Sequence, residues 1–300
     1  MNAQAMDNLQ KKVLVMGSAI LDVVIMLSAL PKSGGDESAR PGERMVGGCA
    51  YNVANILKRL QTPYDLMVPV GSGVYAEQIQ AQLQKDGHGV LVHDPSGDNG
   101  WCLSLVEQDG ERTFITVSGI ESTWKEQWFD HVNVADYDYI YLSGYSFEGE
   151  SADVILRALQ KKKPGARVIF DPSPRASDLN TERLEELYAL NPLIHCNRSE
   201  LQALTGEKDV EKGARRLQKK TREAVVVTLG GEGAFYLENE EAGQVSGSPV
   251  TPVDTIGAGD AHTGGFIAAL VQGRSLKDAC ILGNQMAHRI IQVQGGTLPS

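Results

Sequence analysis

Short runs of β-branched and other apolar residues recur along the chain, and amphipathic stretches lie between them. Continuous apolar runs of four or five residues are typical of parallel strands that are covered on both faces. We predict such strands at six places: Val13–Met16, Leu66–Val70, Tyr139–Leu142, Arg167–Phe170, Leu193–Cys196 and Ala224–Thr228.

The stretches between these runs carry apolar residues at helical spacing. They predict helices at Asn52–Leu60, Ala76–Asp86, Ala152–Lys162, Thr181–Leu190 and Val210–Lys220, followed by two more at Ala258–Gln272 and Leu276–Val293. Strands that alternate with helices indicate an α/β fold with a doubly wound, mostly parallel sheet. We expect residues 1–300 to form a single α/β domain.

Two stretches interrupt the alternation. Residues 20–46 contain the strand-like Val23–Leu27, a turn region and a second extended segment. Residues 100–120 contain two apolar runs on either side of Asp109-Gly110, a strong hairpin signal. We expect both stretches to form a small extra β-sheet. Such a sheet serves either as a lid over a site or as a structural or dimerisation element.

Composition narrows the functional classes. The 300 residues are 42% hydrophobic and 22% charged, as expected for a globular protein. The net charge of −10 disfavours a broad nucleic-acid surface, although a local phosphate pocket remains compatible with it. No run is long enough to span a bilayer, and residues 1–12 lack a signal-peptide core. The four cysteines are widely spaced, which predicts reduced thiols in a cytoplasmic protein.

The strongest candidate for chemistry is the segment from Asp254 to Ala261, which reads DTIGAGDA and opens a predicted helix. Free N–H groups in the first turn of a helix bind anions, and glycines let a ligand approach the backbone. Gly257, Ala258 and Gly259 would therefore cradle a phosphoryl group. Asp260 would accept the proton of an attacking hydroxyl. On its own, however, Gly-x-Gly-Asp is more often a plain helix start.

Two further sites precede the middle of the chain. Gly47 and Gly48 stand before a helix that contains Asn52, whose amide both donates to and accepts from sugar hydroxyls. Asp22 follows the first strand, near the sheet edge where ligands bind in open α/β folds. The alternatives are a helix cap for Asn52 and a solvated loop acid for Asp22.

Two motifs follow the later strands. Asn197 and Glu200 come directly after Leu193–Cys196, and Glu200 would hold Mg²⁺ through water. The same spacing also fits a helix-capping box. The glycine-rich segment from Thr228 to Ala234 would admit a nucleotide, although a plain loop explains it equally well. His262, two residues past Asp260, faces either an acceptor or the helix interior.

In their order and spacing, these motifs resemble those of the ribokinase-like carbohydrate kinase family, also called the PfkB family. The resemblance extends from Gly17 to Gly296. It rests on Gly47-Gly48 with Asn52, on Asn197 to Glu200, and above all on DTIGAGD at 254–260. Asp171-Pro172-Ser173-Pro174-Arg175 resembles a further family stretch, with serine where asparagine is usual, and Gly110 to Thr113 resembles the lid turn.

The resemblance implies an ATP- and Mg²⁺-dependent kinase with Asp260 as base and Gly257, Ala258 and Gly259 as anion hole. It implies acceptor contacts from Asp22, Gly48 and Asn52, and roles near the phosphates and Mg²⁺ for Asn197 and Glu200. It also assigns a nucleotide pocket and, in members that use K⁺, a monovalent cation site. The nucleotide residues are Thr228, Gly230, Gly233 and Asn284, and the potassium residues are Asp254, Ile256 and Gly296.

Departures from the family pattern leave the substrate open. Cys49-Ala50 replaces the usual Lys-Gly, and Ser143-Gly144-Tyr145 stands where ribokinases carry an acid. The leading hypothesis is a kinase of an unphosphorylated sugar or nucleoside. The alternatives are a phosphosugar kinase and a non-catalytic regulatory protein that binds nucleotide or sugar. The resemblance also implies a homodimer joined through the lid sheets.

Overall fold

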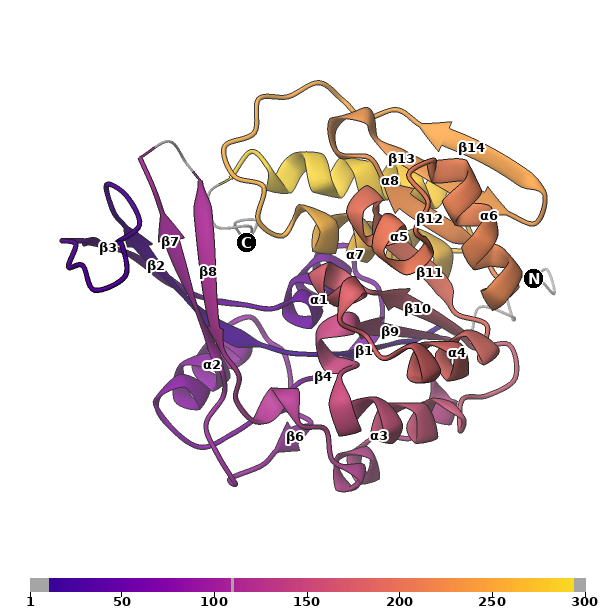
Figure 1. The fold of residues 1–300 in the computed structure, drawn as a ribbon. Helices are drawn as coiled ribbons and strands as arrows, with labels where there is room; N and C mark the ends of the chain where they lie inside the picture. Colours follow the sequence, from indigo (N-terminus) through magenta and orange to yellow (C-terminus); the bar gives the residue numbers. More distant parts are fainter. Residues whose placement is uncertain (1–10, 109–110, 294–300) are drawn as a thin grey trace.

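An eight-stranded sheet lies at the centre of the fold (Figure 1). The structure is a computed structural model that describes residues 11–108 and 111–293. The strand order is β14-β13-β12-β11-β10-β9-β1-β4, and the six strands from β12 to β4 run parallel. The bounds of the eight strands are β1 (Val13–Met16), β4 (Tyr64–Met67), β9 (Tyr139–Ser143), β10 (Arg167–Asp171), β11 (Leu193–Asn197), β12 (Val225–Thr228), β13 (Ala234–Glu238) and β14 (Glu241–Val245).

Alternate residues of the central strands enter two separate hydrophobic cores. In β1, Val13 and Val15 point to one core, and Leu14 and Met16 point to the other. This burial on both faces explains the unbroken apolar runs in the sequence. The first core is covered by α1 (Cys49–Arg59), α2 (Val74–Lys85), α7 (Ala258–Val271) and α8 (Leu276–Ile290). The second is covered by α3 (Gly149–Leu159), α4 (Thr181–Ala189), α5 (Arg198–Thr205) and α6 (Val210–Thr221).

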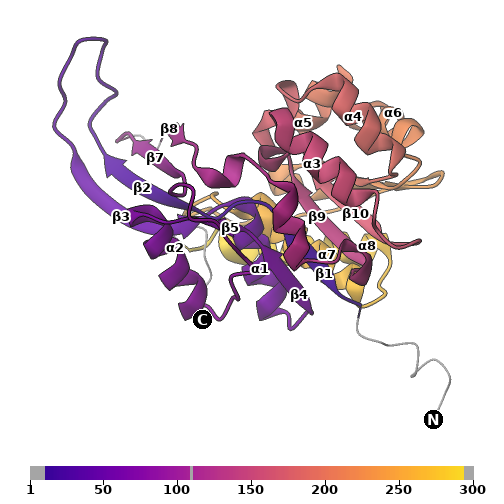
Figure 2. The same cartoon turned by 90° about the horizontal axis from the view of Figure 1, so that it is seen from below.

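A second, four-stranded sheet projects from one end of the central sheet (Figures 1 and 2). Its order is β3-β2-β7-β8. The strands are β2 (Ile20–Met26), β3 (Arg40–Gly47), β7 (Trp101–Val106) and β8 (Arg112–Val117). The two interrupting stretches therefore pair as one extra sheet, and the predicted hairpin strands are confirmed. Asp109 and Gly110 of its turn lie outside the described residues.

The structure differs from the sequence prediction at the sheet edges. The apolar run at 66–70 contains two strands, because the chain leaves the main sheet after β4 and pairs β5 (Pro69–Val70) with β6 (Val92–His93). The antiparallel edge strands β13 and β14 were not predicted. Residues 248–253, which lead to the segment that reads DTIGAGDA, form no strand. Among the helices in residues 11–108 and 111–293, none is both long and apolar enough to cross a membrane.

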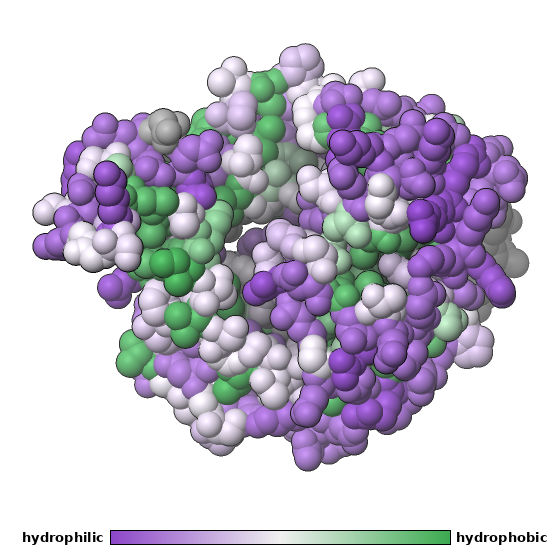
Figure 3. Space-filling model, in the orientation of Figure 1, coloured by the Kyte–Doolittle hydropathy of each residue, from purple (hydrophilic) through white to green (hydrophobic). Residues whose placement is uncertain are grey.

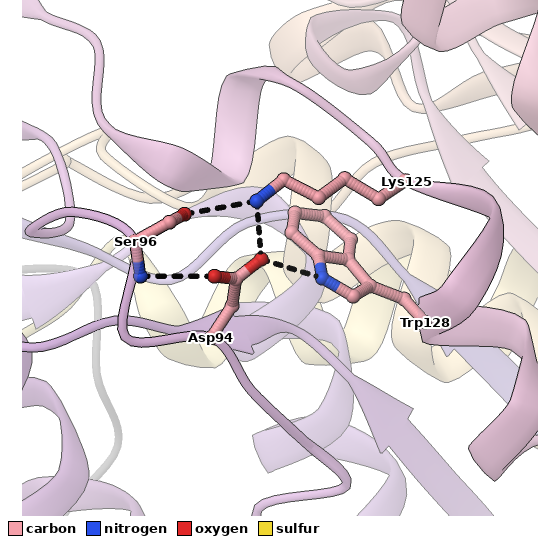
Figure 4. A network of polar contacts seen from close by, with 4 residues as sticks. All are labelled: Asp94, Ser96, Lys125 and Trp128. Atoms are coloured by element: carbon pink, nitrogen blue, oxygen red, sulfur yellow. Dashed lines mark hydrogen bonds and ion pairs between the residues drawn. The ribbon is translucent and has the colours of Figure 1, made fainter.

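A network around Asp94 ties the loop after β6 to the 3₁₀ segment Glu126–His131 (Figure 4). Asp94 accepts from Lys125 Nζ at 2.6 Å and from Trp128 Nε1 at 2.9 Å, and its other oxygen accepts from Ser96 N at 3.0 Å. The hydrogen bond from Lys125 holds the pKa of Asp94 well below its usual range. The charged carboxylate therefore stabilises the fold above its unfolded pKa, and this contribution is lost as the pH falls below about 4.

We expect Asp94→Asn to lower the free energy of unfolding by about 1 to 3 kcal/mol at pH 7, because it removes a charge-assisted, partly buried interaction. Urea denaturation measures the change. Asp130→Asn, an exposed change in the same 3₁₀ segment, should stay within about 0.5 kcal/mol of the native protein. Equal stability of the two variants would contradict the role of this network.

Candidate active site

The first turn of α7 lies beside a carboxylate; its Ala258 N–H donates to the Thr255 carbonyl oxygen at 3.3 Å, whereas the N–H groups of Gly259 and Asp260 have no backbone acceptor among the described residues. Gly257 caps the helix in the left-handed region, with φ 71°, so a residue with a side chain would be strained there. Asp260 lies in this turn, and its Oδ2 accepts a hydrogen bond from Asn52 Nδ2 at 2.8 Å. Asn52 belongs to α1, so this bond joins two helices that are distant in sequence. The turn thus combines an anion-binding backbone with a positioned acid.

Glycines in α7 allow the close helix packing that brings these groups together. A Cβ on Gly264 would lie 2.6 Å from Ile56 Cβ of α1, and one on Gly265 would lie 2.8 Å from Met286 Cγ of α8. Larger residues would push α7 away from both helices. The small residues of this helix therefore set the distance between Asn52 and Asp260.

The double glycine has a separate physical reason at each position. A Cβ on Gly47 would lie 2.1 Å from Asp22 Oδ2, so the Asp22 carboxylate occupies the space that a side chain would fill. Gly48 has φ 108° and would place a Cβ 2.5 Å from the Ser18 carbonyl oxygen. The structure thus brings Asp22, Gly48 and Asn52 to the same region as Asp260.

Burial shapes the titration of this region. Burial, together with the charge of Asp260, raises the pKa of Asp22 to about 6. Burial also raises the pKa of Asp260, while hydrogen bonds from Asn52 and Cys49 partly oppose this rise. Burial and the nearby carboxylates raise the pKa of the Cys49 thiol well above its usual value, so the thiol is protonated at neutral pH. Cys49, which the sequence analysis did not assign to the site, therefore serves as a hydrogen-bond donor to Asp260.

A second acidic group lies at the ends of β10 and β11. Burial and the charges of Glu200 and Asp260 raise the pKa of Asp171 well above its usual range. Burial raises that of Glu200. Ser173, in the left-handed region at φ 57°, donates its N–H to Asp171 at 2.8 Å and contacts the Ser143 hydroxyl at 2.9 Å. The carboxylates of Asp171 at the end of β10, Glu200 in α5 and Asp260 in α7 therefore repel one another.

Asn197 and Glu200 form a capping box at the start of α5. Asn197 Oδ1 accepts from Glu200 N at 2.9 Å, and Glu200 Oε2 accepts from Asn197 N at 2.8 Å. Asn197 Nδ2 also donates to Glu200 Oε1 at 2.7 Å. The capping alternative is therefore realised in the structure. It leaves the Glu200 carboxylate fixed next to Asp171 and Asp260.

A pocket of about 400 Å³ extends from the first turn of α7 along α8. It collects the residues that the sequence analysis assigned to a nucleotide, Thr228, Gly230, Gly233 and Asn284, together with Ala258 and Gly259 of the predicted anion hole. It is also lined by residues that the sequence analysis did not assign to it: Pro249, Val250, His262, Ala287, His288 and Ile291. On α8, the spacing of Asn284, His288 and Ile291 by four and three residues is a signal that points to one helix face.

Of the predicted potassium residues, Asp254 is engaged by two groups of the protein itself. Asp254 Oδ1 accepts from Ile256 N at 3.0 Å, and Asp254 Oδ2 forms a 3.1 Å ion pair with Arg112 of β8. Gly296 lies outside the described residues. No group of three His, Cys, Asp or Glu side chains within residues 11–108 and 111–293 is arranged to hold a metal ion directly.

Comparisons with known proteins place these features in context. Residues 10–300 match the pfkB family carbohydrate kinase profile. An uncharacterized sugar kinase, YegV, from Escherichia coli (strain K12) is 38% identical over 96% of this chain and 90% of its own length. The ribokinase structure from Thermotoga maritima superposes with a TM-score of 0.84 at 24% identity, covering 95% of this chain and 94% of that chain. Arabidopsis thaliana ribokinase complexed with ribose and ATP gives 0.79 at 24% identity, covering 96% and 94%.

We expect Asp22→Asn to stabilise the protein by about 3 kcal/mol at pH 8. A pKa raised from 3.8 to about 6 means that the folded state holds its proton more tightly than the unfolded state. The free energy of unfolding of the native protein therefore falls as the pH rises from about 4 to 6. The uncharged asparagine of the variant does not ionise, so the variant does not show this fall. Urea denaturation at pH 4 and pH 8 measures it, with the exposed Asp36→Asn as control. A gain of equal size at both pH values would contradict the explanation.

Proposed function

The chain belongs to the pfkB carbohydrate kinase family, and from this membership we propose that it transfers the γ-phosphoryl group of ATP to a hydroxyl of an unphosphorylated sugar or nucleoside. The broad class, a phosphotransferase with an alcohol acceptor, follows from the family. The observation that carries the finer proposal is the junction of Asp260, Asn52 and the free N–H groups of α7.

In the proposed reaction, Asp260 takes the proton of the acceptor hydroxyl as the hydroxyl oxygen forms its bond to the γ-phosphorus. The bond from that phosphorus to the bridging oxygen breaks, and ADP leaves. The N–H groups of Gly257, Ala258 and Gly259 would stabilise the charge on the transferring group. The raised pKa of Asp260 makes the carboxylate a better proton acceptor than an exposed aspartate.

The charges around the proposed acceptor region favour an unphosphorylated substrate. A phosphorylated sugar would bring a dianion close to Asp22 and Asp260, which already repel each other. Arg112 is paired with Asp254, and the exposed Arg44 faces Val23, on the side of the sheet opposite Asp22. These arginines are therefore not arranged to neutralise a second phosphate, and a phosphosugar kinase is the less favoured alternative.

The acidic group at the strand ends supports a role for Mg²⁺. The mutual repulsion of Asp171, Glu200 and Asp260 would be relieved by a divalent cation held through water. Mg²⁺ would supply charge neutralisation at the phosphate oxygens. Asn197 would act by fixing Glu200. Potassium binding at Asp254, the Ile256 carbonyl and Gly296 stays a prediction.

The projecting sheet supports the proposal of a lid that also joins two copies of the chain. Its strand β8 exposes Phe114 at 55%, Ile115 at 51% and Val117 at 43%. Figure 3 shows hydrophobic surface gathered on this part of the molecule. Ile115 and Val117 lie on one face of β8, which a second copy would cover.

Light scattering should then give twice the chain mass for the native protein and the mass of a single chain for Ile115→Asp, because the charged side chain would prevent this face from being covered. A monomeric native protein would contradict the dimer.

The decisive experiment compares the native protein with Asp260→Asn, using ATP, Mg²⁺ and a panel of sugars, nucleosides and their phosphates. We expect the native protein to release ADP with an unphosphorylated acceptor. The variant should lose about 10³-fold or more in turnover, because it lacks the proton acceptor. ATP affinity, measured by calorimetry, should change far less, since Asp260 acts on the acceptor.

Asp130→Asn, the same chemical change at an exposed position outside the candidate site, serves as the control and should keep native turnover. Near-native turnover of Asp260→Asn would exclude Asp260 as the base. Turnover only with phosphorylated acceptors would favour the phosphosugar kinase. Tight nucleotide binding without ADP release on any acceptor would favour a regulatory protein.

A further inference from the structure

Two buried histidines lie beneath the nucleotide pocket and have no part in the proposed phosphoryl transfer. His195 comes from β11, and His262 comes from α7, one turn beyond the anion-binding glycines. Each is 2% exposed, and the two ring nitrogens His195 Nε2 and His262 Nδ1 are 2.8 Å apart. His262 also lines the pocket. Buried polar groups of this kind need defined hydrogen-bond partners.

The two histidines belong to a row of hydrogen-bonded groups that ends at the Gly259 carbonyl oxygen. The direction of each hydrogen bond in this row follows from that carbonyl, because it can only accept. Thr263 Oγ1 lies 3.0 Å from the Gly259 carbonyl oxygen, which can only accept, so the hydroxyl proton points there. Thr263 Oγ1 must then accept from His195 Nδ1, which is 3.1 Å away. Burial lowers the pKa of His195 well below its usual value, so this ring has a single proton. Its Nε2 therefore accepts from His262 Nδ1.

The same reasoning leaves a bare lone pair on His262. Burial lowers the pKa of His262 to about 4, so the ring is neutral at pH 7 and its one proton is on Nδ1. Its Nε2 is buried and makes no hydrogen bond within the described residues. The ring packs closely against Gly283 of α8, where a Cβ would lie 2.8 to 2.9 Å from three ring atoms, and this packing fixes the position of the ring. The unpartnered atom is therefore a hydrogen-bond acceptor in a fixed position.

A second acceptor stands beside it. Asn284 Nδ2 donates to the carbonyl oxygens of Val245 at 3.3 Å and Ser246 at 3.4 Å, which fixes the orientation of the amide. Its Oδ1 is then turned away from these two carbonyls. A hydrogen-bonding contribution from this side chain partly opposes the effect of burial and raises the pKa of His262, so the amide lies next to the ring. His262 Nε2 and Asn284 Oδ1 are therefore acceptors to which a donor group of a ligand in the pocket would hydrogen-bond.

Resting on the proposed kinase function, we infer that His262 Nε2, together with Asn284, accepts a hydrogen bond from the nucleoside part of the phosphate donor. The donor group is either an exocyclic amino group of the base or a ribose hydroxyl. Phosphate oxygens do not fit, because they are acceptors at neutral pH and would face another lone pair. The position also agrees, since His262 lies about 5 Å further along α7 than Gly259.

Calorimetry on the full chain tests this inference with ATP, with inosine triphosphate, which lacks the amino group, and with 2′-deoxy-ATP and 3′-deoxy-ATP, which each lack one ribose hydroxyl. One hydrogen bond corresponds to about a 3- to 10-fold change in affinity. We expect His262→Phe to lose that factor for ATP. The native protein should show a similar loss for one of the three analogues, and the variant should show no further loss for that analogue. The exposed His131→Phe is the matched control and should bind all four as the native protein does.

A second variant changes the direction of the hydrogen bonds and leaves His262 in place, so the inference can be tested even if His262→Phe misfolds. Thr263→Val removes the acceptor that fixes His195, so discrimination between ATP and the responsive analogue should weaken, and Thr263→Ser should restore it. The ¹⁵N spectrum of the native protein should show His262 protonated at Nδ1 only, with the Nε2 signal shifting when ATP binds.

An equal loss of affinity for all four nucleotides in His262→Phe would overturn this inference alone, because it would indicate a packing effect. Unchanged affinities in that variant would overturn it as well. Failure of the native protein to bind any of the four would overturn the proposed kinase function along with it.

Discussion

The hydrogen bond between Asn52 and Asp260 is the constraint on which the candidate site depends. It joins the starts of α1 and α7, two helices on the same face of the main sheet. A buried carboxylate is costly unless its charge is compensated, and here the compensation comes from an amide and a thiol. The acid therefore stays reactive: a salt bridge to a cation would have stabilised it more and lowered its pKa.

Glycines make this arrangement possible by removing volume where helices and loops must approach. Gly264 sets the distance between α7 and α1, and Gly47 leaves space for the Asp22 carboxylate. The same constraint operates at the pocket beside α8, where Gly283 allows the His262 ring to lie against that helix. Each of these glycines is explained by the neighbour that occupies the missing side chain's place. Turn geometry alone does not account for them.

The parts of the fold that could be predicted are those whose signal is local. Continuous apolar runs identify the parallel strands, because both faces of those strands are buried, and Asp109-Gly110 identifies the hairpin strands. The edge strands β13 and β14 could not be predicted, because their half-exposed residues lack such a run. In the site, Asp22, Asn52 and Asp260 follow from motifs. The roles of Cys49, Arg112 and His262 depend on which distant residues face them, and no spacing within the sequence shows this.

The ion pair between Arg112 and Asp254 gives the projecting sheet a direct connection to the loop that leads into α7. The Asp254 side chain is only 4% exposed, so the pair is screened little by solvent. A potassium ion at Asp254 would lie close to the Arg112 guanidinium, and the two positive charges would repel each other. Potassium binding at Asp254 would therefore disfavour the position of β8 in which Arg112 pairs with Asp254. If the sheet acts as a lid, its movement and any cation at Asp254 must be coupled through this one carboxylate.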